Sequence, residues 1–234
     1  TDKDGDWRTI PKVARTSEEI IGAAGTKYTI SNSIIAVQEA IEKGCKKIGF
    51  VGTPCQIQAL RKAQLLDEPY ELGQERIVLL IGLFCMENFD YDALMEGLVK
   101  GIFGLLPKDV ERFEIKKGMF RVIDKDGKSH EIKLEETDKF TFIGCGPCFD
   151  FSSELADISV GSVGSPDGWS TVLIRTESGQ NLYDSALNAG DIKENALSEK
   201  GLTLTNKLAS NKIKRFEKCA RELEQSGAKL SIRR

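Results

Sequence analysis

Histidine is nearly absent from this chain, since His130 is the one histidine among 234 residues. It lies among lysine and glutamate residues, so we expect its side chain to be solvated. The sequence therefore offers no basis for histidine-based catalysis. The net charge of −3, with both signs mixed along the chain, also argues against a nucleic-acid-binding module, which would carry a basic stripe.

Long apolar runs and export signals are missing as well. No stretch approaches the roughly 18 uncharged residues that a membrane span requires, and the N-terminal TDKDGDW is not a signal peptide. We therefore expect a soluble, cytoplasmic protein. Because the sequence begins at Thr1 without a methionine, we expect its natural beginning to be missing. The length suffices for one sizeable domain, or for one domain with a small appendage.

The first half of the sequence alternates helical and strand-like segments. RTSEEIIGAAG predicts a short helix with Ser17 as N-cap, and residues 32–44 predict a second helix that ends at Gly44. Buried strands are expected at KKIGFVG and IVLLIGLFC, with helices at GTPCQIQALRKAQ and YDALMEGLVKGIFG. This alternation is the α/β pattern of a mostly parallel sheet with flanking helices.

The second half changes character. Apolar and polar residues alternate around KDGK, which predicts an antiparallel hairpin or a three-stranded meander over residues 110–136. ADISVGSVG and STVLIRTESG predict two more strands, joined by the glycine-rich SPDGW. The C-terminal helix carries one apolar stripe: Ala209, Ile213, Phe216, Ala220 and Leu223. We therefore expect an α/β domain over residues 1–199, with an antiparallel insertion, and a helical tail over residues 200–234.

Four of the six cysteines lie where the chain turns. Cys55 follows a predicted strand at GTPC, Cys85 ends the strand IVLLIGLF, and Cys145 and Cys148 lie in a loop rich in glycine and proline. Because neighbouring parallel strands end on one edge of a sheet, Cys55 and Cys85 can converge there, and the C-x-x-C loop can close over them. Four thiolates at one edge form a ligand set for zinc or for an iron–sulfur cluster.

The spacing favours a cluster without excluding zinc, because a structural zinc site usually brings two compact C-x-x-C pairs and this chain has one. C-G-P-C alone also fits a redox dithiol, although the sequence after it does not begin a good helix. Any of these cysteines can instead be a small buried side chain. We prefer that interpretation for Cys45 and Cys219, which have no partner cysteine close by in the sequence.

Glycine-rich loops are candidate anion sites. Residues 161–171, GSVGSPDGWST, fit an anion-binding nest of backbone N–H groups and a wide hairpin loop equally well. They do not match G-x-G-x-x-G, and no helix is expected directly after them, so a Rossmann assignment fails. In AAGTKYT, Lys27 can meet a phosphate or face water. The GTP of FVGTPCQ is not a P-loop, because no Gly-Lys-Ser/Thr follows it.

Taken in order, the motifs GTKYT, VGTPCQIQALRK, IGLFCMENF and GCGPCFDFSSELADISVGSVGSPDGWSTV resemble the β-subunit family of coenzyme F420-reducing hydrogenases. Relatives of that family include β-subunits of F420-dependent formate dehydrogenases. The resemblance is close over residues 17–176. It implies an iron–sulfur flavoprotein with one [4Fe–4S] cluster, one FAD and a binding site for the deazaflavin F420. Family members usually begin with a further segment, containing a Gly-Gly turn, that contributes to the flavin site and that this sequence lacks.

The resemblance also implies roles for individual residues. The cluster ligands would be Cys55, Cys85, Cys145 and Cys148. Three segments would line the binding site of the flavin or of the deazaflavin, and the resemblance does not say which segment binds which ligand. They are Gly25, Thr26 and Lys27; Gly52, Thr53 and Pro54; and Gly161, Ser162, Val163, Gly164 and Ser165.

The implied function is electron transfer, from a partner through the cluster to FAD and then, as a hydride, to F420. Nothing in the chain resembles a nickel or molybdenum site. We therefore expect partner subunits, either a hydrogenase large subunit with a small iron–sulfur subunit or a formate dehydrogenase catalytic subunit. Two other functions stay open: a flavin–cluster reductase for a different acceptor, such as a formate- or sulfite-linked system, and a non-catalytic module that binds structural zinc.

Overall fold

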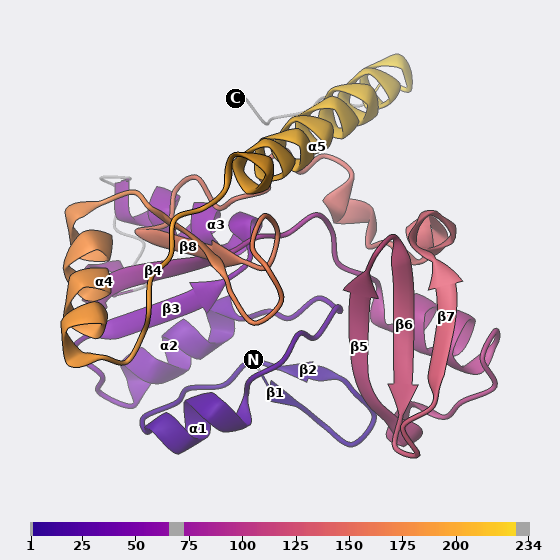
Figure 1. The fold of residues 1–234 in the computed structure, drawn as a ribbon, viewed down its shortest axis with the longest axis horizontal. Coiled ribbons are helices and arrows are strands. Elements are labelled where there is room, and N and C mark those ends of the chain that lie inside the picture. The colour runs from indigo at the N-terminus through magenta and orange to yellow at the C-terminus, as the bar shows by residue number, and fades with distance from the viewer. Residues whose placement is uncertain (1, 66–72, 228–234) are drawn as a thin grey trace. The chain divides into compact units, whose positions relative to one another are not determined.

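The computed structural model describes residues 2–65 and 73–227, which divide into two compact units (Figure 1). Each unit is assembled from two separate stretches of the chain: Thr1–Ala36 with Glu87–Cys145, and Val37–Met86 with Gly146–Arg234. Residues 228–234 of the predicted tail lie outside the described residues. Among the described residues, no helix is long and apolar enough to cross a membrane.

The first unit contains a three-stranded antiparallel sheet. It consists of β5 (Val110–Lys116), β6 (Met119–Asp124) and β7 (Ser129–Lys133), in that order. Lys117 and Gly118 join β5 to β6, and both have positive φ, as a two-residue hairpin turn of type I′ requires. The predicted meander over residues 110–136 is confirmed.

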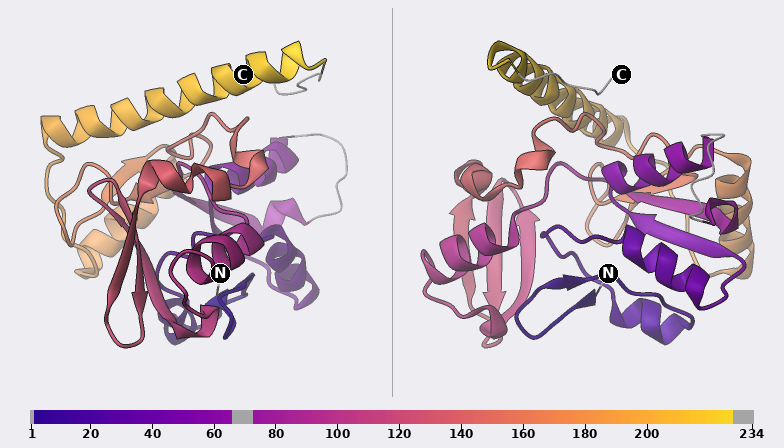
Figure 2. Two further views of the ribbon diagram at one scale, coloured as in Figure 1. Left: turned by 90° about the vertical axis from the view of Figure 1, so that its right-hand side faces the viewer. Right: turned by 180° about the vertical axis from the view of Figure 1, so that it is seen from behind.

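The helix predicted at YDALMEGLVKGIFG is present but is wider than an α-helix. Over Ala93–Lys100 it is a π-helix, and Gly101 and Phe103 donate their N–H groups to carbonyls five residues earlier. Figure 2 shows it lying across one face of the sheet. The buried residues of this unit form one apolar core: Trp7, Phe89, Leu94, Met95, Leu98, Val99, Val110, Phe113, Phe120, Val122 and Phe140.

The N-terminal stretch holds β1 (Asp2–Lys3), which pairs with β2 (Thr9–Ile10), and the short helix α1 (Ser17–Gly22). The N-cap of α1 is Thr16 and not Ser17 as predicted. The Thr16 hydroxyl accepts the N–H of Glu19, and the Glu19 carboxylate accepts the N–H of Thr16. This reciprocal pair of hydrogen bonds is a capping box, in which the N-cap residue stands three positions before the glutamate.

His130 is not solvated, contrary to the sequence prediction. Its Nε2 lies 2.9 Å from Oδ2 of Asp124, its ring contacts that of Phe103, and its side chain is 14% exposed. Oδ1 of Asp124 also accepts the N–H of Lys128 at 2.9 Å. The hydrogen bond to His130 is the main reason that the pKa of the Asp124 carboxyl lies below its ordinary value.

The second unit contains a four-stranded sheet in the order β3 (Ile48–Gly52), β4 (Ile77–Leu83), β8 (Ile158–Gly161) and β9 (Thr171–Ile174). The first three strands are parallel, and β9 runs antiparallel to β8. The predicted mostly parallel sheet is therefore confirmed. β3, which was predicted to be a buried strand, is buried on one face only, since its residues alternate between buried and exposed and Val51 is 52% exposed.

Three more of the predicted helices are present in addition to α1 and the helix over Ala93–Lys100. The helix α2 (Ile34–Glu42) crosses the boundary between the two stretches and is followed by Gly44, whose φ of +77° suits the predicted end. The helix α3 (Pro54–Leu65) begins at the predicted proline. The helix α5 (Glu199–Gln225) has Ser198 as N-cap, and its apolar stripe is half-buried.

A further helix, α4 (Glu177–Ala189), follows β9 where the sequence predicted a strand continuing to residue 179. The Thr176 hydroxyl caps it by accepting the N–H of Gly179 at 3.2 Å, and Gly190 ends it. Gly179 is the one buried residue of α4. Tyr183, Ala186 and Leu187 lie on the same side of the helix and are half-buried, so α4 has an apolar stripe that the strand prediction overlooked.

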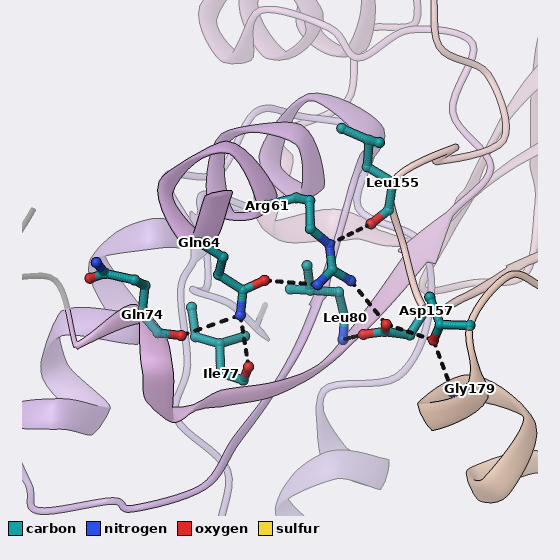
Figure 3. Close-up of polar contacts among 9 residues, drawn as sticks. Arg61, Gln64, Gln74, Ile77, Leu80, Leu155, Asp157 and Gly179 are labelled. Atoms are coloured by element: carbon teal, nitrogen blue, oxygen red, sulfur yellow. Dashed lines mark hydrogen bonds and ion pairs between the residues drawn. The ribbon is translucent and has the colours of Figure 1, made fainter. Parts of the chain in front are cut away.

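A polar cluster joins the elements of the second unit (Figure 3). The Asp157 carboxylate accepts hydrogen bonds from Nη2 of Arg61 at 2.9 Å and from the hydroxyl of Thr176 at 2.8 Å. The amide of Gln64 accepts a hydrogen bond from Arg61 and donates one to the carbonyl of Ile77. The cluster thus links α3, β4 and the start of α4.

Candidate functional site

Two cysteines of the second unit follow the carboxyl ends of neighbouring strands. Gly52, the last residue of β3, pairs with Gly82 of the parallel strand β4. After β3 the chain enters α3, with Cys55 in the first turn, and Cys85 follows β4 by two residues. The sequence argument that places Cys55 and Cys85 after adjacent strand ends therefore agrees with the structure.

The loop that carries Cys148 is tied to the same elements. The N–H of Cys85 donates to the carbonyl of Phe151 at 2.9 Å. Gln58, one turn after Cys55 in α3, donates its amide to the Asp150 carboxylate at 3.1 Å. The Cys148 thiol lies 3.8 Å from the Asp150 carbonyl. Three chain segments, each with one predicted ligand, are thus connected by hydrogen bonds.

Cys145 is the last residue of the first unit, within a short 3₁₀ turn over Ile143–Cys145. Its sulfur accepts the N–H of Asn88 at 3.3 Å and lies 3.7 Å from the Asn88 carbonyl. The first unit therefore holds this thiol against the segment that follows Met86 in the chain.

All six cysteines are free thiols, and Cys55 is exposed while the other five are half-buried. Within residues 2–65 and 73–227, no group of three or more His, Cys, Asp or Glu residues lies close enough together to hold a metal ion. The ligand set of Cys55, Cys85, Cys145 and Cys148 therefore stays a prediction. Cys45 and Cys219, predicted to be buried thiols, are only half-buried.

Two basic side chains of α5 lie against the backbone at Cys85. The ammonium group of Lys212 donates to the carbonyl of Cys85 at 2.5 Å, and Nη2 of Arg215 donates to the carbonyl of Met86 at 2.6 Å. Lys212 is 1% exposed. Sequence reasoning missed this arrangement, because a lysine on a charged helix is expected to face water.

The glycine-rich loop over residues 161–171 borders a pocket of about 750 Å³. The Thr171 hydroxyl donates to the carbonyl of Val163 at 2.7 Å and lies 2.7 Å from the hydroxyl of Ser165, which closes the loop. Of the predicted binding residues, Gly164 and Ser165 line the pocket. The whole lining is formed by Gly164, Ser165, Pro166, residues 168–172, Tyr183 and residues 192–198.

The lining of this pocket also includes Tyr183 and Glu194. The Tyr183 hydroxyl donates to the Glu194 carboxylate at 3.1 Å. Desolvation and, after it, the bond to Glu194 raise the pKa of the Tyr183 phenol above its ordinary value, so the phenol stays protonated at neutral pH. The lining also includes Trp169, which is 41% exposed and therefore accessible to a planar ligand.

The remaining predicted binding residues are engaged within their own units. Lys27 donates to the carbonyls of Ala23 and Ala24 at the end of α1, and its role toward a phosphate stays a prediction. The N–H of Thr53 donates to the side-chain oxygen of Gln56 at 3.1 Å. Gly25–Lys27 belong to the first unit and Gly52–Pro54 to the second.

These features define an α/β protein with the marks of a cofactor-binding fold, because chemically active side chains follow parallel strands and a glycine-rich loop borders a pocket. Two family models match it, and both describe the beta subunit of coenzyme F420 hydrogenase/dehydrogenase. The model of the N-terminal part matches residues 1–38, and the model of the C-terminal part matches residues 45–200. The chain belongs to the coenzyme F420 hydrogenase/dehydrogenase beta subunit family.

Relatives and a solved structure agree with this assignment. The coenzyme F420 hydrogenase subunit beta of Methanococcus voltae is 41% identical over 220 residues, which cover 93% of this chain and 78% of the relative. The coenzyme F420-dependent sulfite reductase of Methanocaldococcus jannaschii is 40% identical over 91% of this chain, but the match covers 34% of that protein.

The solved structure is a chain of the xenon-derivatised F420-reducing [NiFe] hydrogenase complex from Methanosarcina barkeri. It is similar with a TM-score of 0.89 at 40% identity, over 97% of this chain and 78% of that chain. The resemblance found in the sequence motifs and the α/β fold class are both confirmed.

Proposed function

We propose that the chain is the electron-transferring β-subunit of an F420-dependent oxidoreductase, which holds a [4Fe–4S] cluster and FAD and reduces coenzyme F420. The observation that carries the proposal is the 40% identity, over 97% of the chain, to a subunit of an F420-reducing hydrogenase complex. At this identity and coverage, a shared reaction is a stronger inference than a shared fold alone.

We assign Cys55, Cys85, Cys145 and Cys148 as the cluster ligands. Two observations support the fit of the residues to this group. The thiols are free, and those of the second unit lie on segments that hydrogen bonds connect. Lys212 also brings a positive charge to the backbone of Cys85, where a cluster bound by thiolates would bring negative charge.

The glycine-rich loop and its pocket are assigned to the flavin or the deazaflavin. Together, the bound cluster and flavin supply the conversion of single electrons into the hydride that a deazaflavin accepts. Trp169 offers a face on which a planar ring can stack. The segments Gly25–Lys27 and Gly52–Pro54 are assigned to the same two ligands. No acid–base residue is required, so the chain binds and orients its ligands.

We propose a hydrogenase large subunit and a small iron–sulfur subunit as partners, because the similar solved chain belongs to a hydrogenase complex. A second candidate is a flavin–cluster reductase for another acceptor or donor, including a formate dehydrogenase. It is favoured by the match to the sulfite reductase, where a segment like this chain makes up 34% of a larger protein. Both candidates share the cluster, the flavin and F420.

Anaerobic purification followed by assays of iron, acid-labile sulfide, zinc and flavin tests the proposal. We expect four iron atoms per chain, one FAD, and bleaching of F420 when an artificial electron donor is supplied. Zinc without iron or labile sulfide would overturn the proposal in favour of a scaffold module. Cluster and flavin without F420 bleaching would instead favour a reductase for another acceptor.

The ligand assignment has a matched pair of variants. Cys148→Ser should abolish the visible absorption of the cluster and electron transfer from a partner to flavin, but should spare hydride exchange between flavin and F420. Cys219→Ser, which changes a half-buried thiol of α5, should leave the cluster in place. A cluster that survives in the Cys148→Ser variant would show that the ligand set is wrong.

A further inference from the structure

The helix α5 buries a lysine on the face that it turns toward the rest of the second unit. Its three buried residues, Gly201, Thr205 and Lys212, are spaced by four and seven positions and therefore lie on one side of the helix. Gly201 packs closely against the backbone of Gly164, and the Thr205 hydroxyl donates to the carbonyl of Val163. Lys212 continues this contact face at a position where an apolar side chain would be expected.

The surroundings of Lys212 leave its charge uncompensated. In the part of the chain that the structure describes, its ammonium group donates to the neutral carbonyl of Cys85 and forms no ion pair with a carboxylate. Burying an ammonium group without a counter-charge is unfavourable, because water no longer solvates it. A buried lysine in this position is best explained by an anion that binds close to Cys85.

We propose that Lys212 is a positioning residue for the iron–sulfur cluster, which it stabilises in the reduced state through the backbone of Cys85. This inference rests on the proposed function. The hydrogen bond to the Cys85 carbonyl fixes the backbone of a predicted ligand, and the fixed positive charge offsets the negative charge of the cluster. Reduction adds one electron, so the favourable interaction with Lys212 is larger in the reduced cluster, and its reduction potential is raised.

Arg215, about one turn further along α5, brings a second positive charge to the same stretch of backbone. Its guanidinium donates to the carbonyl of Met86, which directly follows Cys85. Two cations of one helix are thus bound to consecutive carbonyls. A purely structural purpose, the attachment of α5 to the sheet edge, would be served as well by neutral donors and needs no buried charge.

The test is a redox titration of the purified holoprotein, monitored by the electron paramagnetic resonance of the cluster. In Lys212→Met, the ratio of reduced to oxidised cluster at a fixed potential should fall about tenfold, a shift of about 59 mV for a one-electron couple. Lys212→Arg should restore the wild-type potential. Lys214→Met is the matched control, because it removes the same charge from an exposed position of the same helix, and it should not shift the potential.

Two outcomes separate this inference from the proposed function. If wild-type protein contains no cluster, both fail. If the cluster is present and Lys212→Met keeps the wild-type potential, the inference about Lys212 alone is wrong.

A second measurement tests the inference even if the Lys212→Met variant does not retain the cluster. After removal of iron by a chelator, urea unfolding should show Lys212→Met to be more stable than the wild type, because an uncompensated buried charge has been removed. A structural lysine predicts the opposite, a loss of stability with or without the cluster, and that result would overturn the inference.

Discussion

The backbone N–H of Leu80, in the middle of β4, donates to Oδ2 of Asp157 at 2.7 Å. Asp157 directly precedes β8, which pairs with β4, and its other carboxylate oxygen binds Arg61 and Thr176 (Figure 3). Each oxygen accepts at least one hydrogen bond, and the side chain is 8% exposed. A single buried carboxylate therefore links a central strand, α3 and the start of α4.

Asp157→Asn should lower the free energy of unfolding by about 3–5 kcal/mol, since an amide has one accepting oxygen and leaves the half-buried Arg61 without its counter-charge. Urea unfolding measures this. Glu222→Gln breaks the exposed ion pair between Lys218 and Glu222 in the same unit and should change the free energy by less than about 1 kcal/mol. Equal effects of the two substitutions would contradict the linking role of Asp157.

Gly201 holds α5 close to the glycine-rich loop. A methyl group at Gly201 would overlap the carbonyl oxygen of Gly164, so Gly201→Ala should push the loop away and cost about 1–3 kcal/mol of stability. It should also reduce ligand retention at the neighbouring pocket, measured as flavin content. In contrast, a methyl group at Gly22 meets no atom within 4 Å, and Gly22→Ala should be neutral or slightly stabilising.

Trp7 anchors the N-terminal stretch to the core of the first unit. Its indole N–H donates to the carbonyl of Val110 at 2.8 Å, and its ring meets that of Phe113 edge-on. Trp7→Phe keeps an aromatic ring but removes the donor, so it should cost about 1–3 kcal/mol in urea unfolding. Trp169→Phe is the matched substitution at a half-exposed ring, and a comparable loss there would refute a specific anchor at Trp7.

Asp124 gives the first unit an acid-sensitive contact. Because its pKa is lowered in the folded state, it contributes stability above the ordinary value of 3.8, and this contribution is lost as the pH falls through the lowered folded value. Asp124→Asn keeps an oxygen for the N–H groups of Asp126 and Lys128 but removes the charge. The stability difference between wild type and variant should therefore shrink as acidification protonates the carboxyl. Urea unfolding at a series of pH values checks this, and a difference that does not change with pH would rule out the contribution.

Much of the sheet was predictable because its strands are apolar and short and are separated by clear turns. β3, β4 and the start of α3 at Pro54 follow directly from the sequence, as does the meander around KDGK. These elements depend on local signals, namely hydrophobic runs, proline in a first helical turn and an Asp-Gly turn between alternating residues. The same signals placed Cys55 and Cys85 after neighbouring strands.

The remaining features depend on contacts that leave no periodic mark. α4 fully buries only Gly179, and its first residues directly continue the strand-like run of β9, so the sequence was interpreted as one longer strand. His130 and Lys212 look like surface residues until the chain folds and supplies Asp124 and the Cys85 carbonyl as partners. The wide turns of Ala93–Lys100 likewise cannot be distinguished from an α-helix in the sequence, since an amphipathic pattern of eight residues fits either.

The alternation of the two units along the chain has a consequence for biosynthesis. The ribosome delivers residues 37–86 before the second stretch of the first unit, so neither unit can be completed in one continuous segment. Until β8 emerges, β4 has an unpaired edge that invites pairing with another chain. Early termination or slow translation between residues 86 and 158 should therefore expose nascent protein to aggregation, and neither unit can be excised as a single uninterrupted fragment.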